Sequence, residues 1–261
     1  ENTTSLREII MRRKNFIVCI GLVFAASLFA ETRYFVSSPR IKDFSPAFAF
    51  VVPISDPDQI VQARSLAQTF PVEDLQDATG INNQLMGARI EAGNDDGLNR
   101  DIGLSNRLWN WRVTEVISFG EIGIHGIFND PLKVENNLDE VLTTGGTSPG
   151  IISFPTYTIT GELPFQPSAI LEDGRKESWF GTFRDDNFPW IGHETFGILY
   201  VSGMDPENIW FWSRDRQTWF FTRESHGNFI YRSSDGAWLF RSEGNQWFYN
   251  YKTQSWEFRA L

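Results

Sequence analysis

The three histidines are the first residues that could perform acid–base or metal chemistry. His125, His193 and His226 are isolated in the sequence, and none has a second histidine at the i, i+4 spacing that places two zinc ligands on one face of a helix. The chain also lacks the phosphate-binding P-loop and the dinucleotide-binding fingerprint. We therefore assign no catalytic residue, no metal ligand and no cofactor, and we expect each histidine to be a surface or capping residue.

Carboxylates are the second group with chemical potential. The chain has 33 aspartates and glutamates, so a secreted hydrolase that uses paired carboxylates is one alternative, but the sequence singles out no pair. The stretch Asn94–Gly97, with Asp101 after it, offers oxygen ligands for calcium without the spacing of an EF-hand. Acidic loops of this kind are usually solvated, and we expect no metal site here.

Aromatic triplets recur at a fixed spacing near the C-terminus and form the strongest pattern in the chain. They come in three copies, at a period of 19 and then 18 residues, and six mostly polar residues separate the two triplets of each copy. The copies are Trp210-Phe211-Trp212 with Trp219-Phe220-Phe221, Phe229-Ile230-Tyr231 with Trp238-Leu239-Phe240, and Trp247-Phe248-Tyr249 with Trp256-Glu257-Phe258. A short fixed period with turn-forming residues between apolar runs predicts one β-hairpin per copy.

The outer residues of each triplet share one face of the predicted sheet, since residues two apart in a strand point the same way. The middle residues are apolar as well, so we expect both faces to be covered over the first two copies, with Glu257 marking a terminal strand that has a wet outer face. Two alternatives remain for the rings. They form the core of a purely structural display tail, or some stay exposed as a platform for stacking.

A stacking platform would suit glycan, because the C–H faces of sugars pack on indole rings. The candidate ligand-binding rings are Trp210, Trp212, Trp219, Tyr231, Trp238, Trp247, Tyr249 and Trp256. The chain is acidic, with a net charge of -10, which disfavours nucleic acid as the stacked ligand.

Residues 177–261 make up the predicted hairpin domain, because the segments 179–183, 189–190 and 197–200 read as degenerate earlier strands. Eight of the ten tryptophans lie in the last 97 residues. Residues 164–176 contain two prolines among mixed apolar and polar residues. Because domain boundaries favour such stretches, this range is the predicted linker.

The preceding part, residues 31–163, has the pattern of an α+β domain. Apolar runs predict strands over 47–54, 85–92, 108–116, 117–128 and 157–163. One helix is expected after Pro57, capped by Ser55 or Asp56, and a second near Pro131, capped by Asn129 or Asp130. The predicted fold is an α+β N-terminal domain, with an antiparallel or mixed sheet and two helices, followed by an all-β domain of aromatic hairpin repeats.

Three stretches of the N-terminal half resemble the small secreted bacterial proteins described as calmodulin-binding-like: residues 50–66, 86–87 and 123–140. The resemblance covers roughly residues 34–162. The matching positions are Asp56, Pro57, Ile60, Ala63, Arg64, Met86, Gly87, Trp109, Ile124, Pro131, Val134, Glu135, Leu138 and Asp139. It implies at most a binding role and no catalytic residues.

This chain departs from that family at His125, Ile127 and Phe128, where the family has an acidic segment with cysteine. The departure removes any cysteine bridge that the family uses. The C-terminal half, over about residues 177–258, resembles the tryptophan-rich tails of exported bacterial proteins and, more loosely, the aromatic hairpin repeats of cell-wall-binding modules.

The N-terminus indicates export. Met11 is followed by three basic residues and by an apolar run from Phe16 to Ala30, which is typical of a secretory signal over residues 11–30, with residues 1–10 as upstream translation. The apolar run is short for a transmembrane anchor, and we expect no transmembrane span in the mature chain. Cleavage would leave 19 basic and 31 acidic groups and would remove Cys19, the only cysteine, so thiol chemistry is excluded.

These patterns together predict an exported, non-enzymatic binding protein. The tryptophan-rich repeat would dock to polysaccharide or to another component of the cell envelope, in the periplasm, at the cell surface or outside the cell.

Overall fold

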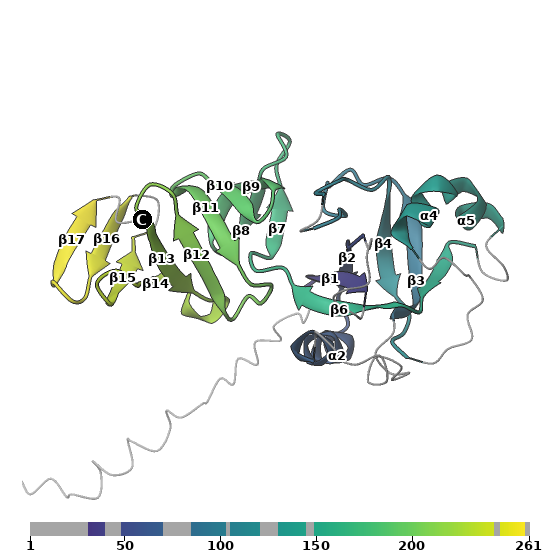
Figure 1. The fold of residues 1–261 in the computed structure, drawn as a ribbon, viewed down its shortest axis with the longest axis horizontal. Coiled ribbons are helices and arrows are strands. Elements are labelled where there is room, and N and C mark those ends of the chain that lie inside the picture. Colours follow the sequence, from purple (N-terminus) through teal and green to yellow (C-terminus); the bar gives the residue numbers. More distant parts are fainter. Residues whose placement is uncertain are drawn as a thin grey trace, which may run out of the picture. The chain divides into compact units, whose positions relative to one another are not determined.

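The computed structural model describes residues 31–39, 48–69, 85–102, 105–120, 130–144, 149–242 and 246–258. The predicted upstream segment and signal peptide, residues 1–30, lie outside the described residues, as does most of the strand predicted over 117–128. Residues 31–261 belong to one compact unit. Within it, an N-terminal region of small antiparallel sheets and short helices precedes a long antiparallel hairpin sheet, which confirms the predicted fold class (Figure 1).

Two three-stranded antiparallel sheets form the N-terminal region. The first has the order β2-β1-β6 and consists of β1 (Arg33–Pro39), β2 (Phe50–Ile54) and β6 (Tyr157–Glu162). The second has the order β4-β3-β5 and consists of β3 (Leu85–Ala92), β4 (Trp111–Val116) and β5 (Ile151–Phe154). Both bury rings in one core, where the Phe50 ring lies 4.6 Å from Phe154 and 5.6 Å from Trp111.

The helix predicted after Pro57 is α2 (Pro57–Gln68). Of the two predicted caps the structure uses Asp56, whose carboxylate accepts hydrogen bonds from the backbone N–H groups of Asp58 and Gln59, both at 2.9 Å. Ala63 and Leu66, one turn apart, are buried against the core. The apolar spacing and the cap therefore suffice to define this helix.

The second predicted helix is divided in two. It begins at Pro131, and Asp130 caps it by accepting a hydrogen bond from Leu132 N–H at 2.7 Å. The chain leaves helical geometry at Asn137, so that α4 (Pro131–Asn136) is followed by a separate α5 (Leu138–Thr144).

The C-terminal sheet has eleven strands, each paired with the next along the chain. The strands are β7 (Pro167–Ile170), β8 (Lys176–Ser178), β9 (Gly181–Asn187), β10 (Trp190–His193), β11 (Gly197–Ser202), β12 (Ile209–Ser213), β13 (Thr218–Thr222), β14 (Phe229–Arg232), β15 (Ala237–Arg241), β16 (Trp247–Asn250) and β17 (Ser255–Phe258). A short 3-10 helix, η2 (Glu224–His226), joins β13 to β14. Each aromatic copy forms a hairpin, β12–β13, β14–β15 and β16–β17, as the spacing predicts.

The inner face of this sheet encloses a second core. The middle residues of five triplets, Phe211, Phe220, Ile230, Leu239 and Phe248, are at most 1% exposed. Rings from two turns reach distant strands there. Phe180, between β8 and β9, lies 5.4 Å from Phe211 of β12, and Phe196, between β10 and β11, lies 5.9 Å from Phe248 of β16. The sheet therefore curls around its own inner face, and this contact replaces a second layer.

The range predicted as a linker contains β7 and the buried Phe165, whose ring stacks on Phe180 at 4.5 Å. A third, smaller cluster lies between the two main cores. It joins Val36, Ile102 and Leu163 to the partly buried Phe188 and Met204.

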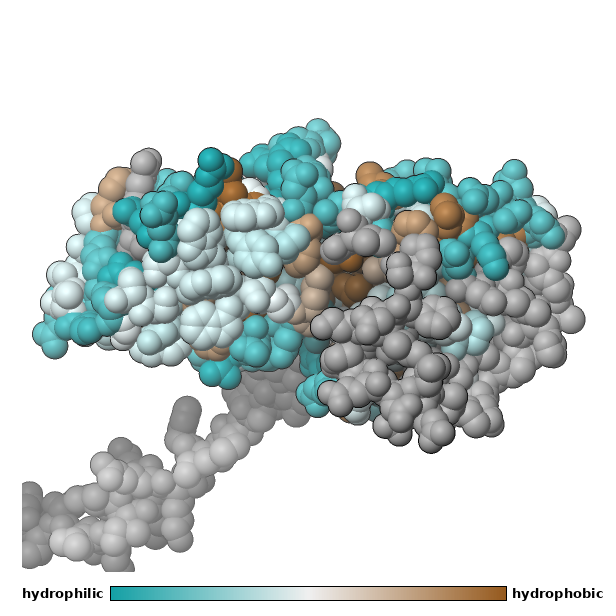
Figure 2. All heavy atoms as spheres, viewed as in Figure 1, coloured by the Kyte–Doolittle hydropathy of each residue, from teal (hydrophilic) through white to brown (hydrophobic). Residues whose placement is uncertain are grey.

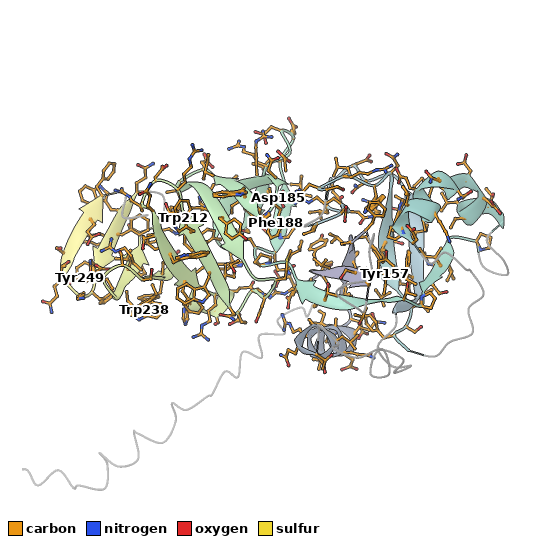
Figure 3. The ribbon with its side chains drawn as sticks, in the orientation of Figure 1. Tyr157, Asp185, Phe188, Trp212, Trp238 and Tyr249 are labelled. Carbon is orange, nitrogen blue, oxygen red and sulfur yellow. The ribbon has the colours of Figure 1, made fainter. Side chains whose placement is uncertain are left out.

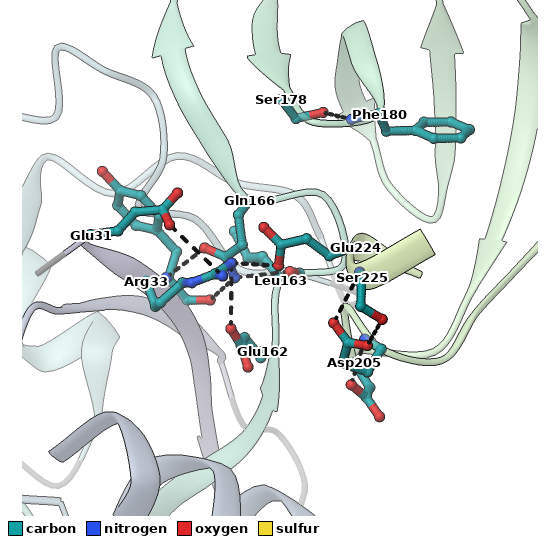
Figure 4. Close-up of polar contacts among 12 residues, drawn as sticks. Glu31, Arg33, Glu162, Leu163, Gln166, Ser178, Phe180, Asp205, Glu224 and Ser225 are labelled. Atoms are coloured by element: carbon teal, nitrogen blue, oxygen red, sulfur yellow. Dashed lines mark hydrogen bonds and ion pairs between the residues drawn. The ribbon is translucent and has the colours of Figure 1, made fainter. Parts of the chain in front are cut away.

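Ion pairs add to this joint between the N-terminal region and the sheet (Figure 4). Arg33 of β1 lies 2.7 Å from a carboxylate oxygen of Glu224 in η2 and 4.0 Å from Glu162 of β6. Glu162 also accepts two hydrogen bonds from Arg64 of α2. None of the helices in the described residues has the length and apolar character needed to cross a membrane.

Candidate binding face

The eight rings predicted to bind ligand all lie on the outer face of the C-terminal sheet. They fall into directly opposed cross-strand pairs within the three hairpins. The pairs are Trp210 with Phe221, Trp212 with Trp219, Tyr231 with Trp238, Trp247 with Phe258, and Tyr249 with Trp256. We call this surface the outer aromatic face.

The rings of this face reach solvent to different extents. Trp210, Trp219 and Trp238 are 36%, 38% and 39% exposed, and Trp247 and Trp256 are 45% and 52% exposed. Trp212, Tyr231 and Tyr249 are half-buried between neighbouring rings. Figure 2 shows side chains of intermediate hydropathy, drawn pale, gathered over this sheet.

The prediction that both faces are covered over the first two copies is therefore wrong. The middle residues of the triplets fill the inner core, whereas the outer residues stay at the surface. The physical reason is the curl of the sheet. One face closes on itself, whereas five tryptophans of the opposite face stay 36–52% exposed, although both faces carry apolar residues.

Edge-to-face contacts fix the positions of the outer rings. The Tyr231 and Trp238 rings lie 5.5 Å apart, and Trp210 reaches across to Tyr231 at 6.4 Å with an interplanar angle of 87°. Tyr249 and Trp256 lie 5.5 Å apart at 67°. Such contacts are favourable, and they hold the rings in place before any ligand arrives. Trp212, Trp238 and Tyr249, from β12, β15 and β16, are labelled in Figure 3.

The outer aromatic face also includes rings that were not among the predicted binding residues. Trp190 of β10 is 41% exposed and lies 6.2 Å from Trp212, and Tyr200 of β11 lies 6.2 Å from Trp219. Tyr251, in the turn after β16, contacts Phe229 at 6.0 Å. The first two lie in segments that read as degenerate strands, so strand alternation could have found them. Tyr251 lies in a turn, where alternation gives no information.

Two basic side chains border this face. The Arg223 guanidinium lies 5.8 Å over the Phe221 ring, and the His226 ring lies 6.0 Å from Phe221 and 5.2 Å from Trp238. Burial, followed by the nearby Arg223 charge, lowers the pKa of His226. His226 is therefore mainly neutral at pH 7.

Glu257 has a different environment from the one predicted. It lies on the inner side of β17, where Arg232 donates to it at 2.7 Å and where Asn250 also hydrogen-bonds to it. The hydrogen bond from Arg232 holds the pKa of the Glu257 carboxyl below its usual range. Glu257 thus closes the end of the inner core with an ion pair and leaves Trp256 and Phe258 on the outer face.

His193 is a buried structural residue. Its Nδ1 accepts hydrogen bonds from the backbone N–H groups of Thr195 and Phe196, at 3.1 and 3.3 Å, and its Nε2 lies 3.2 Å from the carbonyl oxygen of Phe180. Burial lowers its pKa to about 3. A neutral ring with Nε2–H satisfies all three groups, which agrees with the expected capping role.

The acidic loop at residues 94–101 uses its side chains to bind backbone. Asp101 Oδ1 accepts from Ala49 N–H at 2.8 Å, and Asn99 Oδ1 accepts from Val51 N–H at 2.9 Å. Asn94 donates to the carbonyl oxygens of Asn99 and Trp109. The oxygens of Asp101 and Asn99 thus bind N–H groups just before and within β2, and the Asn94 amide holds the loop together. Within the described part of the chain, no three histidine, cysteine or acidic groups come together as a metal site would need.

A cleft of about 470 Å³ beside β4 gathers the carboxylates Asp56, Asp96 and Glu115. Each already has a partner: Asp56 caps α2, Asp96 lies 3.6 Å from Arg112, and Glu115 pairs with Arg89 at 3.0 Å. All three carboxylates are therefore engaged in contacts with the protein itself.

Residues 146–150 read G-T-S-P-G and match the G-x-S-x-G pattern of a serine nucleophile elbow. Such an elbow has a strand before the serine and a helix after it. Here α5 precedes the pattern and β5 follows it, and Ser148 itself lies outside the described residues. The pattern therefore identifies no catalytic serine.

The architecture defined so far is an aromatic hairpin sheet with one buried and one ring-covered face, joined to an α+β region. No family model, no curated protein and no solved structure matches the chain. The two resemblances drawn from the sequence therefore remain predictions.

Proposed function

We propose that this chain is an exported, non-enzymatic binding protein and that its outer aromatic face docks on polysaccharide of the cell envelope. The observation that carries the proposal is the exposure of five tryptophans, between 36% and 52%, on one face of consecutive hairpins. Soluble proteins rarely leave a contiguous apolar surface of this kind without a ligand or partner.

Polysaccharide fits the chemistry of this face. A sugar ring has an apolar C–H side that packs on an indole, and a chain of sugars meets several rings in succession. The edge-to-face contacts hold the rings in fixed positions, so little side-chain entropy is lost on binding. The acidic balance of the chain, at -10, opposes nucleic acid, the other ligand that stacks on aromatic rows.

The exposure of the rings supports binding over a purely structural tail, since that alternative requires them to be buried. The hydrolase alternative has less support, because the carboxylates of the cleft beside β4 are engaged with other groups. Export, at the periplasm, the cell surface or outside the cell, rests on the predicted signal peptide.

Sedimentation of residues 31–261 with insoluble polysaccharides and purified cell-wall sacculi tests the proposal. We expect the wild-type chain to sediment. Trp238→Ala and Trp247→Ala should each weaken binding about tenfold, which corresponds to about 1.4 kcal/mol. Released sugar is measured in the soluble fraction, and its appearance would favour the hydrolase.

Leu108→Ala is the matched control, because Leu108 is 55% exposed but precedes β4, outside the outer aromatic face. Its binding should equal that of the wild type. If the wild-type chain sediments with none of these materials, or if the tryptophan variants bind unchanged, the proposal is incorrect.

A further inference from the structure

Arg223 and His226 lie where the outer aromatic face meets the connection between β13 and β14. Arg223 follows the last residue of β13, and His226 ends η2. Both contact Phe221, and His226 also contacts Trp238. Two further rings belong to this group. The Trp210 ring lies 5.2 Å from Phe221, and the Tyr231 ring lies 5.5 Å from Trp238.

Neither basic residue has a carboxylate partner among the described residues. Arg223 Nε and His226 Nδ1 are buried from solvent and have no hydrogen-bond partner. Atoms shielded from solvent in this way are out of reach of an external ligand, so contact with a ligand falls to the terminal Nη groups of the Arg223 guanidinium, which forms no hydrogen bond or ion pair among the described residues.

The neighbouring carboxylates bind other groups. Glu224, next in sequence to Arg223, pairs with Arg33 at 2.7 Å (Figure 4). Glu207 accepts from the Ser225 hydroxyl at 2.6 Å. By contrast, Arg232, on the inner face, is held by both Asp235 and Glu257. Arg223 is thus a positively charged side chain beside aromatic rings that has no carboxylate partner among the described residues, in a chain whose net charge is -10.

We propose that this corner of the outer aromatic face binds an acidic sugar, with the sugar ring against Trp238 and its carboxylate on the Arg223 guanidinium. The inference rests on the proposed function and narrows its ligand to a polysaccharide that bears carboxylates. A guanidinium presents a planar fork of donors that matches a carboxylate in two parallel hydrogen bonds.

Affinity electrophoresis of residues 31–261 through gels with polygalacturonate, or with its methyl ester, tests this assignment. The two polymers share a backbone, and only the first has free carboxylates. We expect the wild-type chain to bind polygalacturonate at least tenfold more tightly than the ester.

Arg223→Gln should weaken binding to polygalacturonate about tenfold and change binding to the ester less than twofold. Arg223→Lys keeps the positive charge but loses the planar fork of donors. Its affinity for polygalacturonate should lie between those of the wild type and Arg223→Gln. Arg89→Gln is the matched control, since Arg89 is an exposed arginine of β3 in the N-terminal region. Thermal melts of all variants establish that they are folded.

The outcomes separate the two proposals. Equal binding of the wild type to both polymers, or an unchanged affinity in Arg223→Gln, overturns the acidic-sugar assignment while sedimentation with other polysaccharides still supports the binding face. If the chain sediments with no polysaccharide and is retarded by neither polymer, both proposals are overturned.

Discussion

Arg100 and Asp185, 85 positions apart in the chain, form a buried ion pair between the N-terminal region and β9 of the hairpin sheet. Arg100 also donates to the carbonyl oxygen of Asp185 at 2.9 Å, and Lys176 of β8 lies 2.8 Å from the same carboxylate. Burial raises the pKa of Asp185, but the charges of Lys176 and Arg100 outweigh it and hold that pKa below its usual range. The three groups thus depend on one another.

Replacing Arg100 by alanine should lower the free energy of unfolding by about 3 kcal/mol, because Asp185 and Lys176 would stay buried without their third partner. Urea denaturation at pH 7 measures the change. Arg89→Ala is the control, since the Arg89–Glu115 pair is about half-exposed and its loss should change stability by less than about 1 kcal/mol. Equal effects would show that the buried pair does not stabilise the joint.

The opposite faces of β12 predict different consequences for adjacent residues. Phe211 is fully buried and stacks on Phe220 at 5.4 Å, so Phe211→Ala should lower the free energy of unfolding by about 3–5 kcal/mol. Trp210 is 36% exposed on the outer face, and Trp210→Ala should lower it by about 1 kcal/mol. Chemical denaturation of both variants checks which face of the sheet is buried. If Trp210→Ala lowers the free energy of unfolding more than Phe211→Ala does, the assignment of faces is contradicted.

His193 should make the protein less stable in acid. Its pKa is about 3 in the folded state and about 6.5 in the unfolded chain, so the unfolded state binds more protons between these values and stability falls as the pH decreases from about 6.5 towards 3. At pH 4.5 this loss amounts to about 3 kcal/mol.

His193→Asn provides an acceptor for the same turn without a group that titrates in this range. It should lower stability at pH 7.5 and reduce the further loss between pH 7.5 and 4.5 by about 2 kcal/mol, measured by urea denaturation at both values. His226→Asn is the control, because that ring is only half-buried and its contribution should be smaller. If the free energy of unfolding of His193→Asn falls between pH 7.5 and 4.5 as much as that of the wild type, the prediction is contradicted.

Asp101 should be important for stability although it lies in an acidic loop. Its carboxylate accepts from Ala49 N–H at 2.8 Å and from the Ser105 hydroxyl at 2.6 Å, so Asp101→Ala leaves a buried N–H at the edge of β2 without a partner. We expect a loss of about 2–3 kcal/mol in thermal or urea unfolding. Asp95→Ala, at an exposed position in the same loop, should lie within about 0.5 kcal/mol of the wild type.

Elements with a strong local pattern could be predicted from the sequence. The cap and apolar spacing of α2 lie within a few residues of each other, and β3 has the predicted bounds, Leu85–Ala92. The three C-terminal hairpins followed from repeat spacing and turn chemistry. For α2 and the hairpins the information is local, because their hydrogen bonds join residues close in the chain. β3 pairs with the more distant β4 and β5, and its own run of residues is what predicted it.

Elements without such a pattern could not be found in this way. β1 pairs with β6, more than a hundred residues later, and β7 lies in a proline-containing range predicted as a linker. Asn99 and Asp101 resemble solvated or calcium-binding residues until β2 is placed beside them. Arg223 carries no sequence signal, because its role depends on which carboxylates lie near it.

The sequence by itself determined the α+β region, the three C-terminal hairpins and the placing of alternate rings on a common face, since these follow from the periodicity of strands and helices and from the repeat spacing. It could not determine which face is buried, because both the middle and the outer residues of the triplets are apolar. Only the tertiary structure decided that. The curl of the sheet brings Phe180 to Phe211 and Phe196 to Phe248, closes the inner face, and leaves the tryptophans of the outer aromatic face in contact with solvent.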